Sequence, residues 1–242
     1  MSGPDLVTNP LLVALDVDSG EKALALARDL RGAAGGFKIG SRLFTLEGPS
    51  LVRRLADDGL RVFLELKFDD IPNTVAQAVD AAVQTGAWMI NVHASGGAAM
   101  LQAAVRAGEE AAARHGRPAP LLIAVTVLTS MDEGTLHEVG VRRPLDDHVV
   151  ALAQMARAAG LGGVVASARE AAGIRQACGD DFVIVTPGIR GAGAPRDDQA
   201  RTLGPAEAIR AGATYIVVGR PIIAAPQPRA AADAIVEEMR RT

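Results

Sequence analysis

Eight short apolar segments at nearly regular intervals constrain the fold of this chain more than any other feature of its sequence. Each is followed by an Ala-rich stretch with helical periodicity, and this alternation is typical of repeated strand-helix units. The mean spacing of about thirty residues accommodates one strand, one helix and two short loops. The predicted strands are Leu11–Leu15, Gly36–Ile39, Arg61–Leu66, Trp88–Val92, Leu121–Val125, Gly163–Ala166, Phe182–Val185 and Tyr215–Val218. Eight such units predict an α/β fold, a (β/α)₈ or TIM barrel.

No linker, low-complexity tract or shift in composition interrupts the series, so we predict one domain. Residues 1–10 read as a flexible N-terminal leader, and residues 11–242 as the barrel domain. A length of 242 residues suits a single barrel.

Composition narrows the fold and the class of ligand. Apolar residues make up 49% of the chain and aromatic residues 3%, so the core must be built from Val, Ile, Leu and Ala, as in a parallel barrel. This composition argues against an all-β sandwich. The net charge of -3, without a basic stripe, argues against a nucleic-acid partner. An anionic small molecule would need a local positive pocket.

Cys178 is the single cysteine, which excludes an internal disulfide and a cysteine-based metal cluster. This usage indicates a reducing compartment, so we predict a cytoplasmic protein. No apolar stretch approaches the ~20 residues of a membrane span, and residues 1–10 lack the pattern of a signal peptide. We therefore expect no membrane partner.

Two connections are longer than usual, from Leu128 to Pro144 and from Gly188 to Pro205. Both follow the carboxyl end of a predicted strand. Because that end of a parallel barrel carries the active site, we expect these loops to act as lids or binding loops.

Lysine is scarce, since only Lys22, Lys38 and Lys67 stand among 25 basic residues. Arginine does not give up its proton in a protein, whereas a lysine can be tuned to act as an acid. Lys38 and Lys67 end predicted strands and are therefore candidates for proton transfer. Lys22 lies at a predicted helix start and is expected to be solvated.

Charged residues collect at the ends of the first three strands. They are Asp16, Lys38, Glu65, Lys67 and Asp70. Residues i and i+2 of a strand point the same way, which puts Glu65 and Lys67 on one face. If that face is the barrel interior, the cluster lines the mouth; the alternative is a structural salt-bridge network that closes the barrel.

A phosphate site is predicted after the last two strands, where Thr186 to Arg190 and Val218 to Arg220 follow in turn. Barrels commonly bind phosphate there through backbone N–H groups, and Arg220 adds a bidentate donor. The alternative is a surface arginine beside a turn. His93 could be a base but is more often a wall residue in such a position. The glycines at 188, 191 and 193 are wrongly spaced for a dinucleotide fingerprint.

The segment Glu65 to Thr74 resembles the signature of the bacterial orotidine 5′-phosphate decarboxylases. Similar matches cover residues 11–230 and fall at strand ends in order. They are Ala14 to Asp16, Phe37 to Gly40, Asn91 to Ala94, Val125 to Ser130, Thr186 to Arg190, Asp198-Gln199 and Val217 to Arg220. The resemblance implies a carboxy-lyase of de novo pyrimidine biosynthesis that converts orotidine 5′-phosphate to UMP and CO₂.

Carried over by position, the resemblance implies a role for each matching residue. Lys67 would donate a proton to C6 of the pyrimidine, with Lys38, Asp16 and Asp70 as charged neighbours. Thr129 would lie against the pyrimidine. The residues implied to hold the 5′-phosphate are Arg190, Gln199, Gly219 and Arg220. The resemblance implies a homodimer, in which Asp70, Ile71 and Thr74 reach the partner's site. Loss of CO₂ with protonation by a lysine needs no cofactor, and we expect no metal because Lys38 and Lys67 compensate the carboxylates.

Glu65 departs from the family pattern, which usually has Asp at this position. The charge is kept, but the carboxylate lies one methylene farther from the backbone. We expect Glu65 to be functional, beside the carboxylate of the substrate.

Two other functions remain open from the sequence. Related barrels that act as metal-dependent sugar-phosphate decarboxylases or aldolases share the Lys67-x-x-Asp70 element, but usually carry an acidic residue where this chain has Lys38. The second is a non-catalytic phosphate-ligand binder that kept the barrel. Turnover of orotidine 5′-phosphate would exclude the non-catalytic binder.

Overall fold

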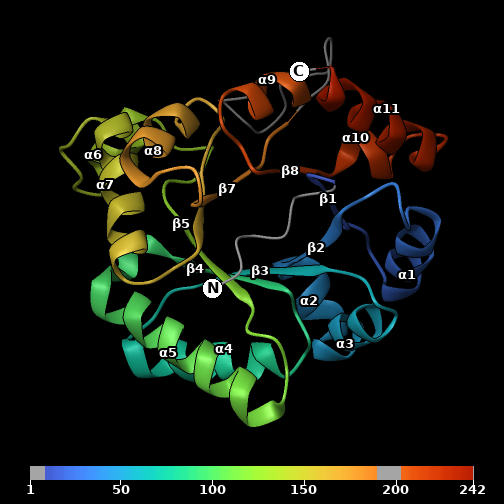
Figure 1. Cartoon of the computed structure of the whole chain (residues 1–242), viewed down its shortest axis with the longest axis horizontal. Helices are drawn as coiled ribbons and strands as arrows, with labels where there is room; N and C mark the ends of the chain where they lie inside the picture. The colour runs from blue at the N-terminus through green and yellow to red at the C-terminus, as the bar shows by residue number, and fades with distance from the viewer. Residues whose placement is uncertain (1–8, 190–202, 242) are drawn as a thin grey trace.

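Eight parallel strands close into a barrel in chain order, and β8 pairs back onto β1 (Figure 1). The computed structural model describes residues 9–189 and 203–241. The strands are β1 Leu11–Ala14, β2 Gly36–Gly40, β3 Val62–Phe68, β4 Met89–His93, β5 Leu121–Val125, β6 Gly163–Val165, β7 Val183–Thr186 and β8 Tyr215–Val218. The predicted (β/α)₈ barrel is confirmed, as a single domain.

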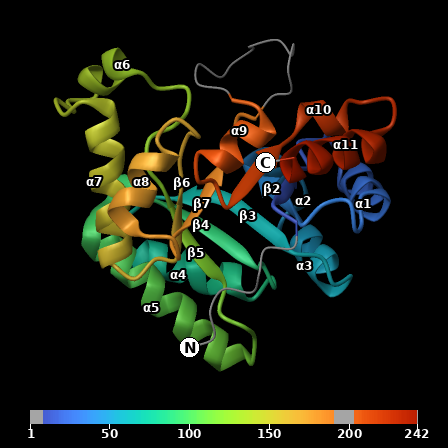
Figure 2. The same ribbon diagram turned by 45° about the horizontal axis from the view of Figure 1, so that its top comes forward.

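Helices surround the strands as an outer ring (Figure 1). They are α1 Gly20–Asp29, α2 Ser41–Glu47, α3 Pro49–Asp57, α4 Pro72–Val83, the 3₁₀ turn η1 Ala94–Gly96, α5 Gly97–His115, α6 Glu133–Glu138, α7 Leu145–Ala158, α8 Ala171–Cys178, α9 Pro205–Arg210, α10 Arg220–Ile223 and α11 Pro228–Arg240. Figure 2 shows α4 and α5 on one side of the strands and α1, α10 and α11 on the other. No helix among the described residues is long and apolar enough to cross a membrane.

The apolar residues form two layers because the strand side chains alternate between the barrel interior and the helices. Residues such as Leu12, Phe63 and Ile123 fill the interior. Their neighbours, such as Val13 and Leu64, pack in the outer layer with the helices. At the amino-terminal end of the strands, Trp88 meets Tyr215 edge to face, with ring centroids 5.4 Å apart.

The predicted strand bounds differ from the observed ones by no more than two residues. The largest difference is in β3, which ends at Phe68 and not at Leu66. Its pairing with β4 is irregular: Leu64 pairs with Ile90, and Phe68 pairs with Val92. Three residues of β3 therefore face Asn91 alone, as a bulge at the level of the predicted lysine.

The predicted long connection from Leu128 to Pro144 contains the short helix α6. Asp132 caps this helix, because its carboxylate accepts a hydrogen bond from the Thr135 N–H at 2.8 Å. In the other long connection, residues 190–202 lie outside the described part of the chain.

Candidate active site

A pocket of about 500 Å³ opens at the carboxyl ends of the strands. Side chains at the ends of β1, β2, β3, β5, β6, β7 and β8 line it. Its volume lies within the range of sites that hold a small organic ligand. The strand ends thus supply the pocket, as expected for a barrel of this kind.

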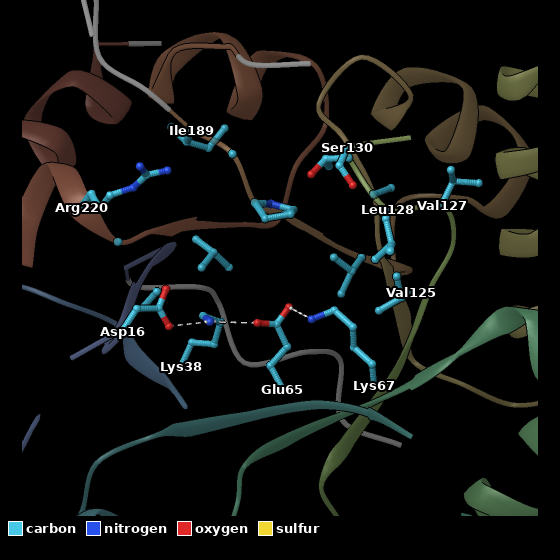
Figure 3. A pocket seen from close by; sticks show the side chains of 18 residues that line it. Asp16, Lys38, Glu65, Lys67, Val125, Val127, Leu128, Ser130, Ile189 and Arg220 are labelled. Carbon is cyan, nitrogen blue, oxygen red and sulfur yellow. Dashed lines mark hydrogen bonds and ion pairs between the residues drawn. The ribbon is translucent and has the colours of Figure 1, made fainter. Parts of the chain in front are cut away.

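Four charged residues form a row of alternating charge along one wall (Figure 3). The Lys38 ammonium lies 3.1 Å from Asp16 and 2.9 Å from Glu65. The other oxygen of Glu65 lies 3.1 Å from the Lys67 ammonium. The row therefore reads Asp16, Lys38, Glu65, Lys67, and the prediction that Glu65 and Lys67 share the interior face is confirmed.

Burial makes the pairing of Lys38 with Glu65 strong. Desolvation alone would lower the pKa of Lys38, but attraction by Glu65 and then Asp16 outweighs it, so that pKa is raised. Desolvation alone would raise the pKa of Glu65, but attraction by Lys38 and Lys67 lowers it below its ordinary value. Both groups are thus held in their charged forms at neutral pH.

Gly40 makes room for this row. It follows Lys38 by two residues in β2 and so faces the same way. A Cβ built at Gly40 would lie 3.0 Å from the Lys38 ammonium nitrogen. Any larger residue would push against the ammonium that links Asp16 to Glu65.

The Lys67 backbone has a φ of 53°, and no other non-glycine residue in the described ranges has a positive φ. This left-handed conformation costs about 1–3 kcal/mol in a residue with a side chain. The Lys67 N–H donates to the Asn91 side-chain oxygen at 2.8 Å. Asn91 is fully buried. Sequence analysis gave Asn91 no role of its own; the signal is an amide within the otherwise apolar start of β4.

Thr129, Gly219 and Arg220 also line the pocket. Gly219 precedes the single turn of α10, where Arg220 is the first residue. Figure 3 shows Arg220 across the pocket from Lys67, on the side where Asp16 lies. The predicted phosphate-binding and proton-donating residues thus occupy different ends of one pocket.

The remaining predicted residues do not join this pocket. Asp70, Ile71 and Thr74 are exposed, and none of them lines it. Within one chain, Asp70 therefore does not join the row of Asp16, Lys38, Glu65 and Lys67. The reason is that β3 ends at Phe68, after which the chain turns outward into α4 and Asp70 accepts a hydrogen bond from the Ile71 N–H.

Two predicted phosphate ligands, Arg190 and Gln199, lie outside the described residues.

His93 is held in a small polar cluster with Ser95 and Asp69. Its ring nitrogen lies 2.7 Å from the Ser95 hydroxyl, which in turn donates to Asp69 at 3.0 Å. Desolvation lowers the pKa of His93, which favours a neutral ring. These contacts fit the interpretation of His93 as a wall residue.

The described residues contain no group of three or more His, Cys, Asp or Glu side chains that could hold a metal ion. Asp16 and Glu65, the two carboxylates of the row, have the Lys38 ammonium between them. A lysine already occupies the place where a cation would be attracted.

Comparison with known proteins identifies the family of this chain. A family model described as the orotidine 5′-phosphate decarboxylase / HUMPS family matches residues 9–235. Orotidine 5′-phosphate decarboxylase of Moorella thermoacetica is 55% identical over 230 residues, which cover 95% of this chain and 91% of the relative. The enzyme of the same name from Syntrophotalea carbinolica is 54% identical over 229 residues, or 95% of this chain and 94% of the relative.

Among solved structures, orotidine 5′-phosphate decarboxylase from Lactobacillus acidophilus superposes with a TM-score of 0.83 at 36% identity, covering 96% of this chain and 99% of that one. Sequence and fold agree over nearly the whole length of the chain. The chain belongs to the orotidine 5′-phosphate decarboxylase / HUMPS family.

Proposed function

We propose that this protein decarboxylates orotidine 5′-phosphate to UMP and CO₂. The observation that carries the proposal is the row Asp16, Lys38, Glu65, Lys67 in a pocket of suitable size for a nucleotide, with Arg220 at its far side. The relatives at 54–55% identity bear the name of this enzyme. The reaction would belong to pyrimidine biosynthesis.

Lys67 is the proposed proton donor. When the bond between C6 and the carboxylate breaks, CO₂ leaves and the electron pair stays on C6. The Lys67 ammonium can stabilise this charge as it develops and then transfer a proton to C6, becoming a neutral amine that regains its proton from water. The reaction needs no electron acceptor, and we expect no cofactor.

Glu65 is proposed to lie beside the carboxylate that leaves. Two such charges at about 4 Å repel by about 4 kcal/mol at an effective dielectric constant of about 20. Their repulsion ends when CO₂ departs, and full expression of that energy would correspond to about a thousandfold in rate. The two lysines on either side of Glu65 keep it ionised for this role.

We propose that the phosphate binds at Gly219 and Arg220, together with Arg190 and Gln199, and that Thr129 contacts the pyrimidine. The guanidinium of Arg220 can bind phosphate oxygens through two hydrogen bonds. Binding energy at this end holds the reacting end in place. The separation of Arg220 from Lys67 in the pocket supports such a division (Figure 3).

We also propose a homodimer with shared sites. Asp70, Ile71 and Thr74 are exposed and stand outside the pocket of their own chain, which leaves them available to a partner's pocket. Ile71 is 66% exposed, so its side chain is open to contact with a partner. We place the protein in the cytoplasm, where a free, buried Cys178 stays reduced.

The test is an absorbance assay of the purified protein with orotidine 5′-phosphate, with and without EDTA. We expect conversion to UMP at the same rate in both. Activity that disappears in EDTA and returns with Mg²⁺ would favour a metal-dependent sugar-phosphate enzyme. Tight binding of UMP without any turnover would favour a non-catalytic binder.

A further inference from the structure

We infer that Asn91 is a positioning residue, which holds the backbone of Lys67 so that its ammonium reaches the reacting atom. The inference rests on the proposed function, because it assigns Asn91 a part in proton transfer. Asn91 acts through Lys67.

The first observation is the bulge in β3. Leu64 pairs with Ile90 and Phe68 with Val92, so two steps along β4 match four steps along β3. In a regular parallel ladder, every second residue of β3 would bond to the backbone of β4. Here Lys67 lies in the extra length, where regular strand pairing with β4 is interrupted.

The second observation is the bond that replaces the ladder. The Lys67 N–H donates to the Asn91 side chain at 2.8 Å, within the normal range for such a bond. The bond is partly buried, and an N–H that loses its acceptor in such a place costs free energy, so this bond favours the position that Lys67 adopts. Its left-handed φ of 53° is a conformation that must be held by the surroundings.

The third observation concerns the nitrogen of the same Asn91 side-chain amide. The Asn91 side-chain nitrogen is buried and has no hydrogen-bond partner among the described residues. A leucine has nearly the same size and would leave no donor unpaired in the barrel. Packing alone therefore does not account for an asparagine here, whereas an acceptor for Lys67 does.

These observations connect one amide to the geometry of proton transfer. Without the acceptor, Lys67 loses the bond that favours its left-handed backbone, and its ammonium can move from its position 3.1 Å from Glu65. A displacement of the order of 1 Å at a reacting group can cost about a hundredfold in rate. Binding at Gly219 and Arg220 involves other strands and is not affected.

The experiment compares Asn91→Leu with Asn91→Asp. Leucine removes the acceptor at nearly constant volume, whereas aspartate keeps an oxygen in the same place. We expect kcat of Asn91→Leu to fall about a hundredfold, with KM and UMP affinity within about twofold of the parent. Asn91→Asp should recover kcat to within about tenfold of the parent, because the bond to Lys67 can form again.

Thr126→Val is the matched control. Thr126 is buried, and its hydroxyl donates to the Val165 carbonyl at 3.0 Å, so this variant also loses one buried bond from side chain to backbone. It should lower the melting temperature by an amount similar to Asn91→Leu while leaving kcat unchanged. Equal loss of kcat in both variants would mean that Asn91 acts only on stability, and would overturn the inference.

Crystal structures of the parent and Asn91→Leu separate this inference from the proposed function. We expect φ of Lys67 to leave the positive region in the variant. A positive φ retained there would overturn the inference, whatever the activity. A parent that binds UMP but does not turn over orotidine 5′-phosphate would overturn the proposed function and with it the role of Asn91 in proton transfer.

Discussion

The ammonium of Lys67 lies 3.1 Å from Glu65 at one end of the pocket, while Arg220 lies at the other. This separation predicts that substitutions of the two residues change different kinetic constants. Lys67→Ala should lower kcat by more than about a thousandfold but leave UMP binding intact, because it removes the proton donor alone. Arg220→Ala should raise KM by about a hundredfold, since it removes binding energy remote from the reaction.

Steady-state kinetics and calorimetric titration with UMP measure both variants. Near-normal turnover in Lys67→Ala would contradict the assignment of Lys67 as the proton donor. If Arg220→Ala moved neither KM nor kcat, the phosphate would bind elsewhere.

Glu65 bridges two ammonium groups, and this contact explains how its longer side chain fits the row. We predict that Glu65→Gln lowers kcat at least about tenfold, equivalent to about 1.4 kcal/mol. Glu65→Asp should keep substantial activity, because a small backbone adjustment can restore the carboxylate. Steady-state kinetics of both variants and of the parent, with UMP affinity measured separately, test these predictions. An unchanged kcat in Glu65→Gln would show that the charge is dispensable.

The same carboxylate should affect stability in acid. The pKa of Glu65 is lowered from its ordinary value of 4.5, so the folded state binds its proton less readily than the unfolded state. Its contribution to the free energy of unfolding is therefore present above pH 4.5 and is lost as pH falls through the lowered pKa. Urea unfolding below pH 4.5 should show a steeper loss in the parent than in Glu65→Gln; equal slopes would contradict the lowered pKa.

At the scale of elements, Gly40 of β2 leaves the space that the Lys38 ammonium occupies. A Cβ at Gly40 would come within 3.0 Å of the ammonium nitrogen. We predict that Gly40→Ala displaces Lys38 and lowers kcat about tenfold. Gly173→Ala in α8 is the control, because its Cβ would meet Val150 at an ordinary 3.5 Å. The kcat and the melting temperature are measured for both variants. Equal kcat values in the two variants would show that Gly40 tolerates a methyl group.

The strands could be predicted from the sequence because each is an apolar run between polar turns. The sequence also brought together Asp16, Lys38, Glu65 and Lys67, since strand ends of a parallel barrel meet at one mouth. The bulge in β3 could not be predicted in this way. It depends on an acceptor from β4, a strand more than twenty residues later, and no local pattern in residues 62–68 reports that contact.

The position of Asp70 depends on the end of β3, which spacing does not fix. The sequence predicts an end at Leu66, whereas β3 ends at Phe68 and the chain then turns into α4. Side chains that serve a second copy of the chain cannot be separated by spacing from those that serve their own.

At the scale of the whole molecule, the exposed residues at the start of α4 predict that activity depends on association. Ile71 is 66% exposed, so Ile71→Asp should weaken the proposed dimer and lower activity together with the molar mass. Val139→Asp is the matched control, because Val139 is 64% exposed on another part of the surface. Light scattering should give an unchanged mass for Val139→Asp. A fully active monomeric Ile71→Asp variant would contradict shared sites.

The contact between Trp88 and Tyr215 has a practical consequence. The chain contains one Trp and one Tyr, and both lie at the floor of the barrel, at the opposite end of the strands from the pocket. The intrinsic tryptophan and tyrosine fluorescence therefore comes only from the amino-terminal end of the barrel. A substitution at the mouth can be followed through unfolding by this emission without an added dye. A shift in the folded protein's emission maximum would reveal that a change at the mouth had travelled the length of the barrel.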